Sequence, residues 1–195
     1  MLNKIEFNVK DNGFYGIYYP NPKGSKYAMI AMLGDSCDDY LAKHGVKWLH
    51  SLGLNVLAMS PAPKDYSCHN LAIERFKSAI NYLKANNNIK IGILGASTTG
   101  MLALIVASYY EDITMTIAIS ASDFVMEGYY QENGIERPGN NESTVSYKAV
   151  PLPYLPYAYR HPEYYEKIKE EAKKGKNMIA SYEMFILSKK LHPIT

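Results

Sequence analysis

The most constraining feature of the sequence is a regular alternation of apolar runs with segments of helical spacing. Apolar runs occupy residues 27–33, 54–59, 89–94 and 114–119, and helical segments at 38–52, 71–86 and 98–110 lie between them. Buried parallel strands have continuous apolar runs because helices cover both faces of their sheet. The alternation therefore predicts an α/β fold with a mostly parallel sheet between two helical layers.

The segments that flank this core are less regular. Runs at 4–9 and 14–19 are separated by Asp11-Asn12-Gly13, so we expect an antiparallel strand pair joined by a tight hairpin turn. From residue 123 onward tyrosine and proline become frequent and no period holds, except in a helix that should begin at Pro162 and stop at Gly175. We predict a single domain over residues 1–195, with a core at 1–122, an irregular Tyr/Pro-rich cap at 123–187 and a tail at 188–195.

Composition narrows the class of protein. The chain has 195 residues, 47% of them hydrophobic, and 21 Lys and Arg against 19 Asp and Glu with the signs interspersed. This balance predicts no nucleic-acid partner and no anionic membrane surface. No stretch approaches the roughly 20 apolar residues of a membrane span, no signal peptide opens the chain, and Cys37 and Cys68 have neither disulfide-framework nor zinc spacing. We therefore predict a cytoplasmic protein with no membrane association, no metal and no cofactor.

The residues that indicate chemistry follow the apolar run at 89–94. There the sequence reads Gly95-Ala96-Ser97-Thr98-Thr99-Gly100 at the start of a helical segment. A serine in a sharp strand-to-helix turn with small neighbours is typical of a nucleophile elbow, which lifts the hydroxyl out of the sheet. Thr99 stands where the Gly-x-Ser-x-Gly pattern has its last glycine. The predicted nucleophile is Ser97, with Gly95 and Gly100 as the glycines of the elbow.

Other interpretations of these six residues are a plain glycine-rich turn and a phosphate-binding loop. From the motif alone, the plain turn of an α/β fold has about the same weight as the elbow. A Walker loop needs Lys and then Ser or Thr after its last glycine, where Met101 and Leu102 follow here. The dinucleotide fingerprint Gly-x-Gly-x-x-Gly is absent as well.

A second feature that favours acyl chemistry is Gly34-Asp35-Ser36, at the end of the run at 27–33. Elbow hydrolases take one oxyanion donor from this loop and the other from the residue after the nucleophile. We expect the backbone N–H groups of Asp35 and Thr98 to hold the oxyanion. Alternatively, Ser36 caps the helix that begins near Asp38, and both interpretations can hold together.

Several stretches carry a family resemblance. They are Gly34-Asp35, the elbow at 95–100, Ser120-Ala121-Ser122-Asp123-Phe124, and Tyr147 with Pro151-Leu152-Pro153-Tyr154. Through them, residues 27–195 resemble the C-terminal α/β-hydrolase domain of the acyl-CoA thioester hydrolase and bile acid-CoA:amino acid N-acyltransferase family, grouped with dienelactone-hydrolase-like proteins. The resemblance implies a three-layer α/β-hydrolase sandwich, with its last strands missing here, and Ser97 as nucleophile.

The resemblance also implies a triad acid on the loop after the next sheet strand and a histidine near the C-terminus. Neither position is matched, because family members continue for two strands beyond the motif at 187–193, so the chain resembles one truncated at its C-terminus. Local substitutes are Asp123, His161 and His192, which we expect to be solvated or helix-flanking residues instead. The remaining histidines, His44, His50 and His69, are typical of surface or packing positions.

These features predict a serine acyl hydrolase or acyltransferase that acts on a small-molecule ester or thioester, as an acyl-CoA thioesterase does. We expect little or no turnover by residues 1–195 alone. The alternative is a non-catalytic remnant or binding module that keeps the fold. Because the strand at 114–119 lacks its usual neighbour, we expect either a homodimer through that exposed edge or residues 178–187 folded across it.

The tyrosines of the cap allow two interpretations. They form one wall of an acyl pocket, or they hold a long loop against the sheet. The residues concerned are Tyr129, Tyr130, Tyr154, Tyr157 and Tyr159.

Overall fold

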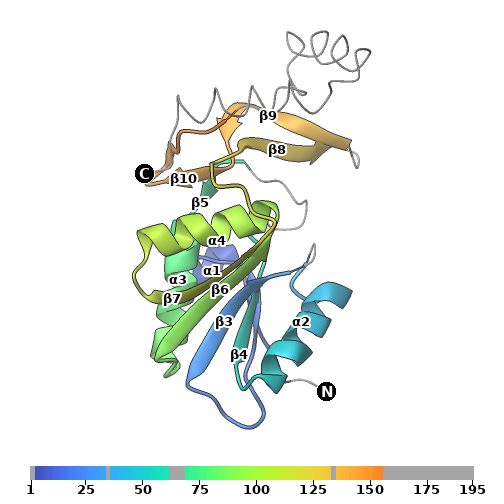
Figure 1. The fold of residues 1–195 in the computed structure, drawn as a ribbon, viewed down its shortest axis with the longest axis vertical. Coiled ribbons are helices and arrows are strands. Elements are labelled where there is room, and N and C mark those ends of the chain that lie inside the picture. The colour runs from blue at the N-terminus through green and yellow to red at the C-terminus, as the bar shows by residue number, and fades with distance from the viewer. Residues whose placement is uncertain (1–2, 34–35, 62–68, 133–134, 156–195) are drawn as a thin grey trace.

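The central element of the fold is a six-stranded sheet with strand order β1-β2-β4-β3-β6-β7 (Figure 1). The computed structural model describes residues 3–33, 36–61, 69–132 and 135–155, and within these it describes only the backbone at 130–132 and 135–141. The strands are β1 (Ile5–Phe7), β2 (Gly16–Tyr19), β3 (Tyr27–Met32), β4 (Asn55–Met59), β6 (Lys90–Ala96) and β7 (Ile113–Ile119). β4, β3, β6 and β7 run parallel, and β2 and β1 add antiparallel strands at one side. The predicted α/β fold with a mostly parallel sheet is confirmed.

Helix α2 (Tyr40–Ser51) covers one face of this sheet. Its buried side chains Val46 and Leu49 pack with Met29 of β3 and Val56 of β4, which are at most 1% exposed. Complete burial of an aliphatic side chain of this size contributes roughly 1.5–3 kcal/mol. This contact fixes the helix that follows the β3 loop against the middle of the sheet.

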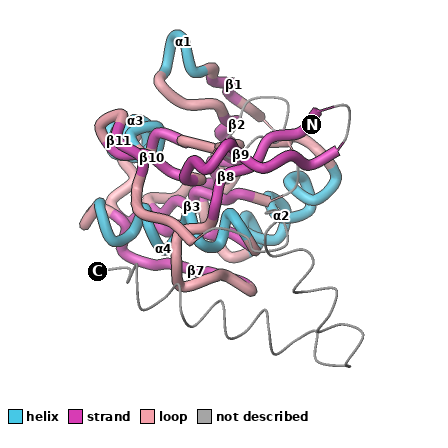
Figure 2. Tube along the Cα trace, turned by 90° about the horizontal axis from the view of Figure 1, so that it is seen from above, coloured by secondary structure: helices cyan, strands magenta, loops and turns pink. Residues whose placement is uncertain are grey.

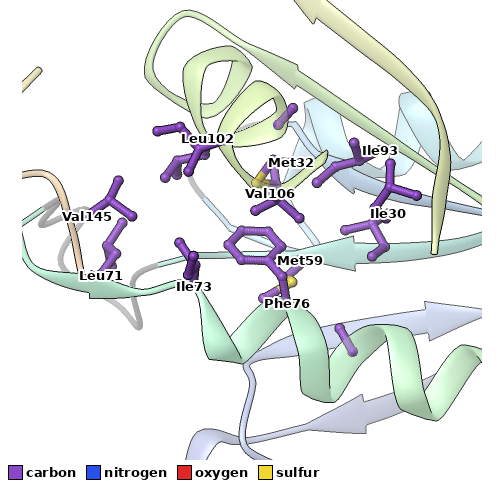
Figure 3. Packing of buried hydrophobic residues seen from close by; sticks show 14 of the residues in the cluster. Ile30, Met32, Met59, Leu71, Ile73, Phe76, Ile93, Leu102, Val106 and Val145 are labelled. Atoms are coloured by element: carbon purple, nitrogen blue, oxygen red, sulfur yellow. The ribbon is translucent and has the colours of Figure 1, made fainter. Parts of the chain in front are cut away.

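Helices α3 (Glu74–Ala85) and α4 (Thr98–Tyr109) cover the other face. Figure 3 shows Phe76 of α3 and Val106 of α4 facing Ile30 and Ile93 of the sheet. These side chains belong to one buried cluster that continues through α4. Helix α4 is therefore held by its own core packing, and its first turn lies at the end of β6.

The connection between β1 and β2 differs from the predicted hairpin turn. A short helix, α1 (Val9–Asn12), joins the two strands. The Asn8 side chain caps it by accepting a hydrogen bond of 2.9 Å from the Asp11 N–H. Gly13 then reverses the chain at a φ of 77°, a left-handed conformation that costs glycine little. The antiparallel pairing was predicted correctly. The predicted tight turn was wrong, because the Asn8 cap stabilises a short helix in its place.

The helix expected over 71–86 begins three residues late. Strand β5 (Leu71–Ala72) instead pairs in parallel with β10 (Val145–Tyr147). The Leu71 N–H donates to the Thr144 carbonyl at 2.9 Å, and the Ile73 N–H donates to the Ser146 carbonyl at 3.1 Å. The apolar spacing at these residues fits a strand as well as a helix. Only the long-range pairing with β10 decides between the two.

The segment after β7 was predicted to be irregular, but it contains regular strands. It contains a hairpin of β8 (Glu127–Glu132) and β9 (Ile135–Ser143), followed by β10 and β11 (Val150–Pro151). Figures 1 and 2 show these strands over the carboxyl ends of the parallel strands. The predicted helix from Pro162 to Gly175 and the apolar segment at 178–187 lie outside the described residues.

Candidate active site

Ser97 lies at the turn between β6 and α4, where the sequence places it. Its backbone has φ 53° and ψ −121°, and the residue is exposed. A positive φ is costly for a residue with a Cβ and persists only where the surroundings impose it. Its side chain makes no capping hydrogen bond to α4. The predicted sharp strand-to-helix turn with an exposed serine is confirmed, and the positive φ adds backbone strain to it.

Space requires glycine at position 95 and favours it at position 100. A Cβ at Gly95 would lie 2.1 Å from the Thr99 carbonyl oxygen and 2.8 Å from the Gly100 nitrogen. A Cβ at Gly100 would lie 3.0 Å from the Cβ of Ala121 and 3.2 Å from the Ile119 carbonyl oxygen. The close approach of α4 to the ends of β6 and β7 therefore explains both glycines.

Backbone hydrogen bonds hold the elbow on both sides. The Ser97 N–H donates to the Ile119 carbonyl at 2.8 Å, and the Met101 N–H donates to the Ser97 carbonyl at 3.0 Å. Thr98 is the first residue of α4, so its N–H has no acceptor within the helix and lies at the positive end of the helix dipole. This N–H is suited to stabilise negative charge that develops beside Ser97. The other predicted donor, Asp35, lies outside the described residues.

The loop that leads into α2 corrects one predicted cap. Asp39, not Ser36, caps the helix by accepting from the Ala42 N–H at 2.8 Å. Ser36 donates its N–H to Asp39 at 3.1 Å. Cys37 next to it is buried, and this burial raises the pKa of its thiol to about 12. Cys37 is therefore protonated and unreactive at neutral pH.

A second strained serine lies at the end of β7. Ser120 has φ 49° and is exposed, and it directly follows Ile119, whose carbonyl accepts from Ser97. Asp123, the sequence candidate for the acid, is exposed on the same loop. Two adjacent strand ends thus have left-handed residues, as is common where the backbone is constrained at a functional site.

The histidines of the described residues have structural contacts. His44 Nδ1 lies 2.8 Å from the Tyr40 carbonyl, and its ring packs on that of Tyr40 with centroids 3.9 Å apart. His50 Nε2 lies 3.0 Å from the Tyr19 carbonyl, and His69 is exposed. His161 and His192 lie outside the described residues.

The cap tyrosines with described side chains differ in burial. Tyr129 is 7% exposed and belongs to the main apolar cluster, and Tyr154 packs against that cluster while partly exposed. Burial raises the pKa of the Tyr154 hydroxyl. The position of Tyr129 supports the interpretation in which it holds the cap to the core. The side chains of the other three, Tyr130, Tyr157 and Tyr159, lie outside the described set.

The described ranges contain neither a cluster of metal-ligating side chains nor a membrane-spanning helix. No group of three or more His, Cys, Asp and Glu side chains there is arranged to hold a metal ion. None of the helices described has the length and apolar character needed to cross a bilayer.

The arrangement of sheet, helices and elbow defines the α/β-hydrolase fold. Among solved structures, the chain is similar to the Pyrococcus furiosus esterase Pf2001, with 22% identity and a TM-score of 0.51 over 63% of this chain and 50% of that one. A second crystal form of that esterase gives 20% identity and a TM-score of 0.48 over 63% and 58%. The match to the first form thus spans half the length of the esterase chain.

The family follows from a direct sequence match. The family described as BAAT / acyl-CoA thioester hydrolase C terminal matches residues 71–182, which is more than half of the chain. The chain belongs to this family. No curated protein matches it.

Proposed function

We propose that this protein is a serine acyl hydrolase whose substrate is a small ester or thioester, with Ser97 as nucleophile. The observation that carries the proposal is the conformation of Ser97, which is exposed and has a positive φ at the start of α4. Such strain is maintained where a side chain must be presented. The family match supports an acyl substrate.

The chemistry assigned to the elbow is acyl transfer to water in two steps. Ser97 Oγ loses its proton to a general base and bonds to the substrate carbonyl carbon, and the negative charge collects on the carbonyl oxygen. The N–H groups of Thr98 and Asp35 stabilise this oxyanion. The C–O or C–S bond then breaks, and the leaving alcohol or thiol takes a proton. Water attacks the acyl-serine and releases the carboxylic acid, with Ser97 reprotonated.

The test compares hydrolysis by the chain with hydrolysis by its Ser97→Ala variant, for a p-nitrophenyl ester and for an acyl-CoA thioester. The same pair is also assayed in any longer protein that the reading frame encodes. Removal of a triad serine lowers kcat by about 10⁶-fold in a complete hydrolase.

A fluorophosphonate probe supplies an independent measurement. It should label one peptide, the one that contains Ser97, and Ser97→Ala should abolish the labelling. Equal rates for both proteins at every length, together with no labelling, would refute the hydrolase and favour the binding remnant.

A further inference from the structure

The Thr99 side chain is buried inside the elbow and has three backbone partners. Its Oγ1 accepts a hydrogen bond of 2.9 Å from the Ala96 N–H. The same hydroxyl lies 2.8 Å from the Ala96 carbonyl and 3.2 Å from the Met32 carbonyl, and it donates to both. A hydroxyl has one proton, so the two carbonyls share it. Thr99 is 6% exposed, which protects these bonds from competition with water.

These partners join two parts of the candidate site. Ala96 is the residue before Ser97, and Met32 is the last residue of β3, opposite Gly95 of β6 in the sheet register. The hydroxyl therefore lies between the end of β3 and the turn that presents Ser97. The chain leaves Met32 directly into the loop that contains Asp35, the expected oxyanion donor.

Gly95 and Thr99 make different contributions to the elbow. The close approach of α4 to β6 is already provided by Gly95, where a Cβ would meet the Thr99 carbonyl oxygen at 2.1 Å. At position 99 the usual elbow pattern has glycine, which offers no side-chain donor or acceptor. The distinctive property of Thr99 is thus its hydroxyl.

We infer that Thr99 is a positioning residue, whose hydroxyl fixes Ser97 relative to the end of β3. The inference rests on the proposed role of Ser97 as nucleophile. Reacting groups that are misplaced by about 1 Å can lose about 100-fold in rate. Loss of the hydroxyl should therefore lower kcat and leave KM unchanged, because the substrate surface stays the same.

The experiment compares Thr99→Val, which keeps the shape and removes the hydroxyl, with Thr99→Ser, which keeps the hydroxyl. Thr114→Val is the matched control, since its hydroxyl also bonds a β6 carbonyl, that of Ile91 at 3.3 Å, but at the opposite end of the sheet. Two quantities are measured on each protein. They are kcat and KM for ester hydrolysis, and the hydrogen-exchange rates of the Ala96 and Ser97 amides.

The expected result is a fall in kcat of about 10-fold to 100-fold for Thr99→Val with KM unchanged, and near-native kcat for Thr99→Ser and Thr114→Val. The Ala96 amide should exchange about 10-fold faster in Thr99→Val alone. Native kcat or native Ala96 exchange in Thr99→Val would overturn the inference. If the unmutated protein hydrolyses no faster than Ser97→Ala at every length and no probe labels Ser97, the proposed function fails. The exchange rates then still decide whether the Thr99 hydroxyl holds the turn.

Discussion

At the scale of single residues, the elbow keeps a serine in a conformation that suits glycine. The φ of 53° at Ser97 costs about 1–3 kcal/mol and is retained because α4, β6 and β7 hold both sides of the turn. If this cost supports access to the hydroxyl, the elbow lowers the stability of the fold in exchange for exposure of its candidate nucleophile.

This strain predicts the order of stability of two variants that both lack the hydroxyl. Ser97→Gly should be more stable than Ser97→Ala by about 1–2 kcal/mol, because glycine adopts a positive φ freely and alanine does not. Ser51, the last residue of α2, is the matched control, and there glycine should be no more stable than alanine. Urea unfolding measures all four proteins. Equal stability of the two Ser97 variants would show that the turn is not strained.

The sequence was sufficient to place Ser97, because small residues and a strand-to-helix change lie next to each other. It was insufficient for Thr99, whose hydroxyl meets Met32 across 67 positions of the sequence. The alternative in which Ser36 caps α2 was wrong because Asp39 does so, and several short polar residues that can all cap a helix stand in a row there.

At the scale of elements, the apolar runs predicted the central strands to within a few residues, and long-range pairing decided the rest. β5 was missed because its two residues become a strand only through β10. The hairpin of β8 and β9 was missed although Asn133-Gly134, a common turn pair, stands between them. Local patterns therefore found the buried sheet and contain a signal for the β8–β9 hairpin, whereas the β5–β10 pairing depends on residues far apart in the sequence.

The turn between β10 and β11 offers a stability prediction. Its two residues, Lys148 and Ala149, have φ 51° and 61°, the left-handed pair that favours Asn-Gly in tight hairpins. Ala149→Gly should raise the free energy of unfolding by about 1 kcal/mol because the strain is removed. Ala149→Ser, which keeps a Cβ, should not. A thermal or urea titration measures the difference, and equal stability of both variants would contradict the prediction.

A pair of salt bridges joins α3 to the start of β7. Lys77 and Lys84 lie 2.8 Å and 2.5 Å from the Asp112 carboxylate, and their hydrogen bonds lower its pKa. Because the folded pKa lies below the unfolded one, the contribution to stability is present above about pH 4 and is lost as the pH falls through the folded pKa.

Asp112→Asn should therefore cost more stability at pH 7 than at pH 2.5, because lowering the pH removes the contribution of the carboxylate charge. The measurement is urea unfolding at both pH values, with Glu111→Gln as the control on the exposed neighbour. A loss of the same size at both pH values would show that the carboxylate charge does not contribute.

At the scale of the whole molecule, the two sides of the sheet are covered unequally within the described residues. α3 and α4 cover one face, and α2 covers the other over β3 and β4. Met29 packs under α2, and Met29 and Met115 both lie beside Gly92, so Met115 of β7 is on the α2 face of the sheet. Its side chain is nevertheless 47% exposed. Ile119 of the same strand is 50% exposed. β7 is also the last strand of the main sheet in the part of the chain that is described.

An open edge with apolar side chains favours pairing with another chain. We therefore expect residues 1–195 to self-associate through β7 and to show a mass above the monomer in light scattering. Met115→Lys should shift that mass toward the monomer, since a lysine at this position would be buried in the contact. Leu52→Lys, at an exposed apolar residue just after α2, should not change it. A monomer whose β7 amides show fast hydrogen exchange would contradict the prediction. A monomer whose β7 amides are protected from exchange would favour the alternative in which residues 178–187 cover the strand.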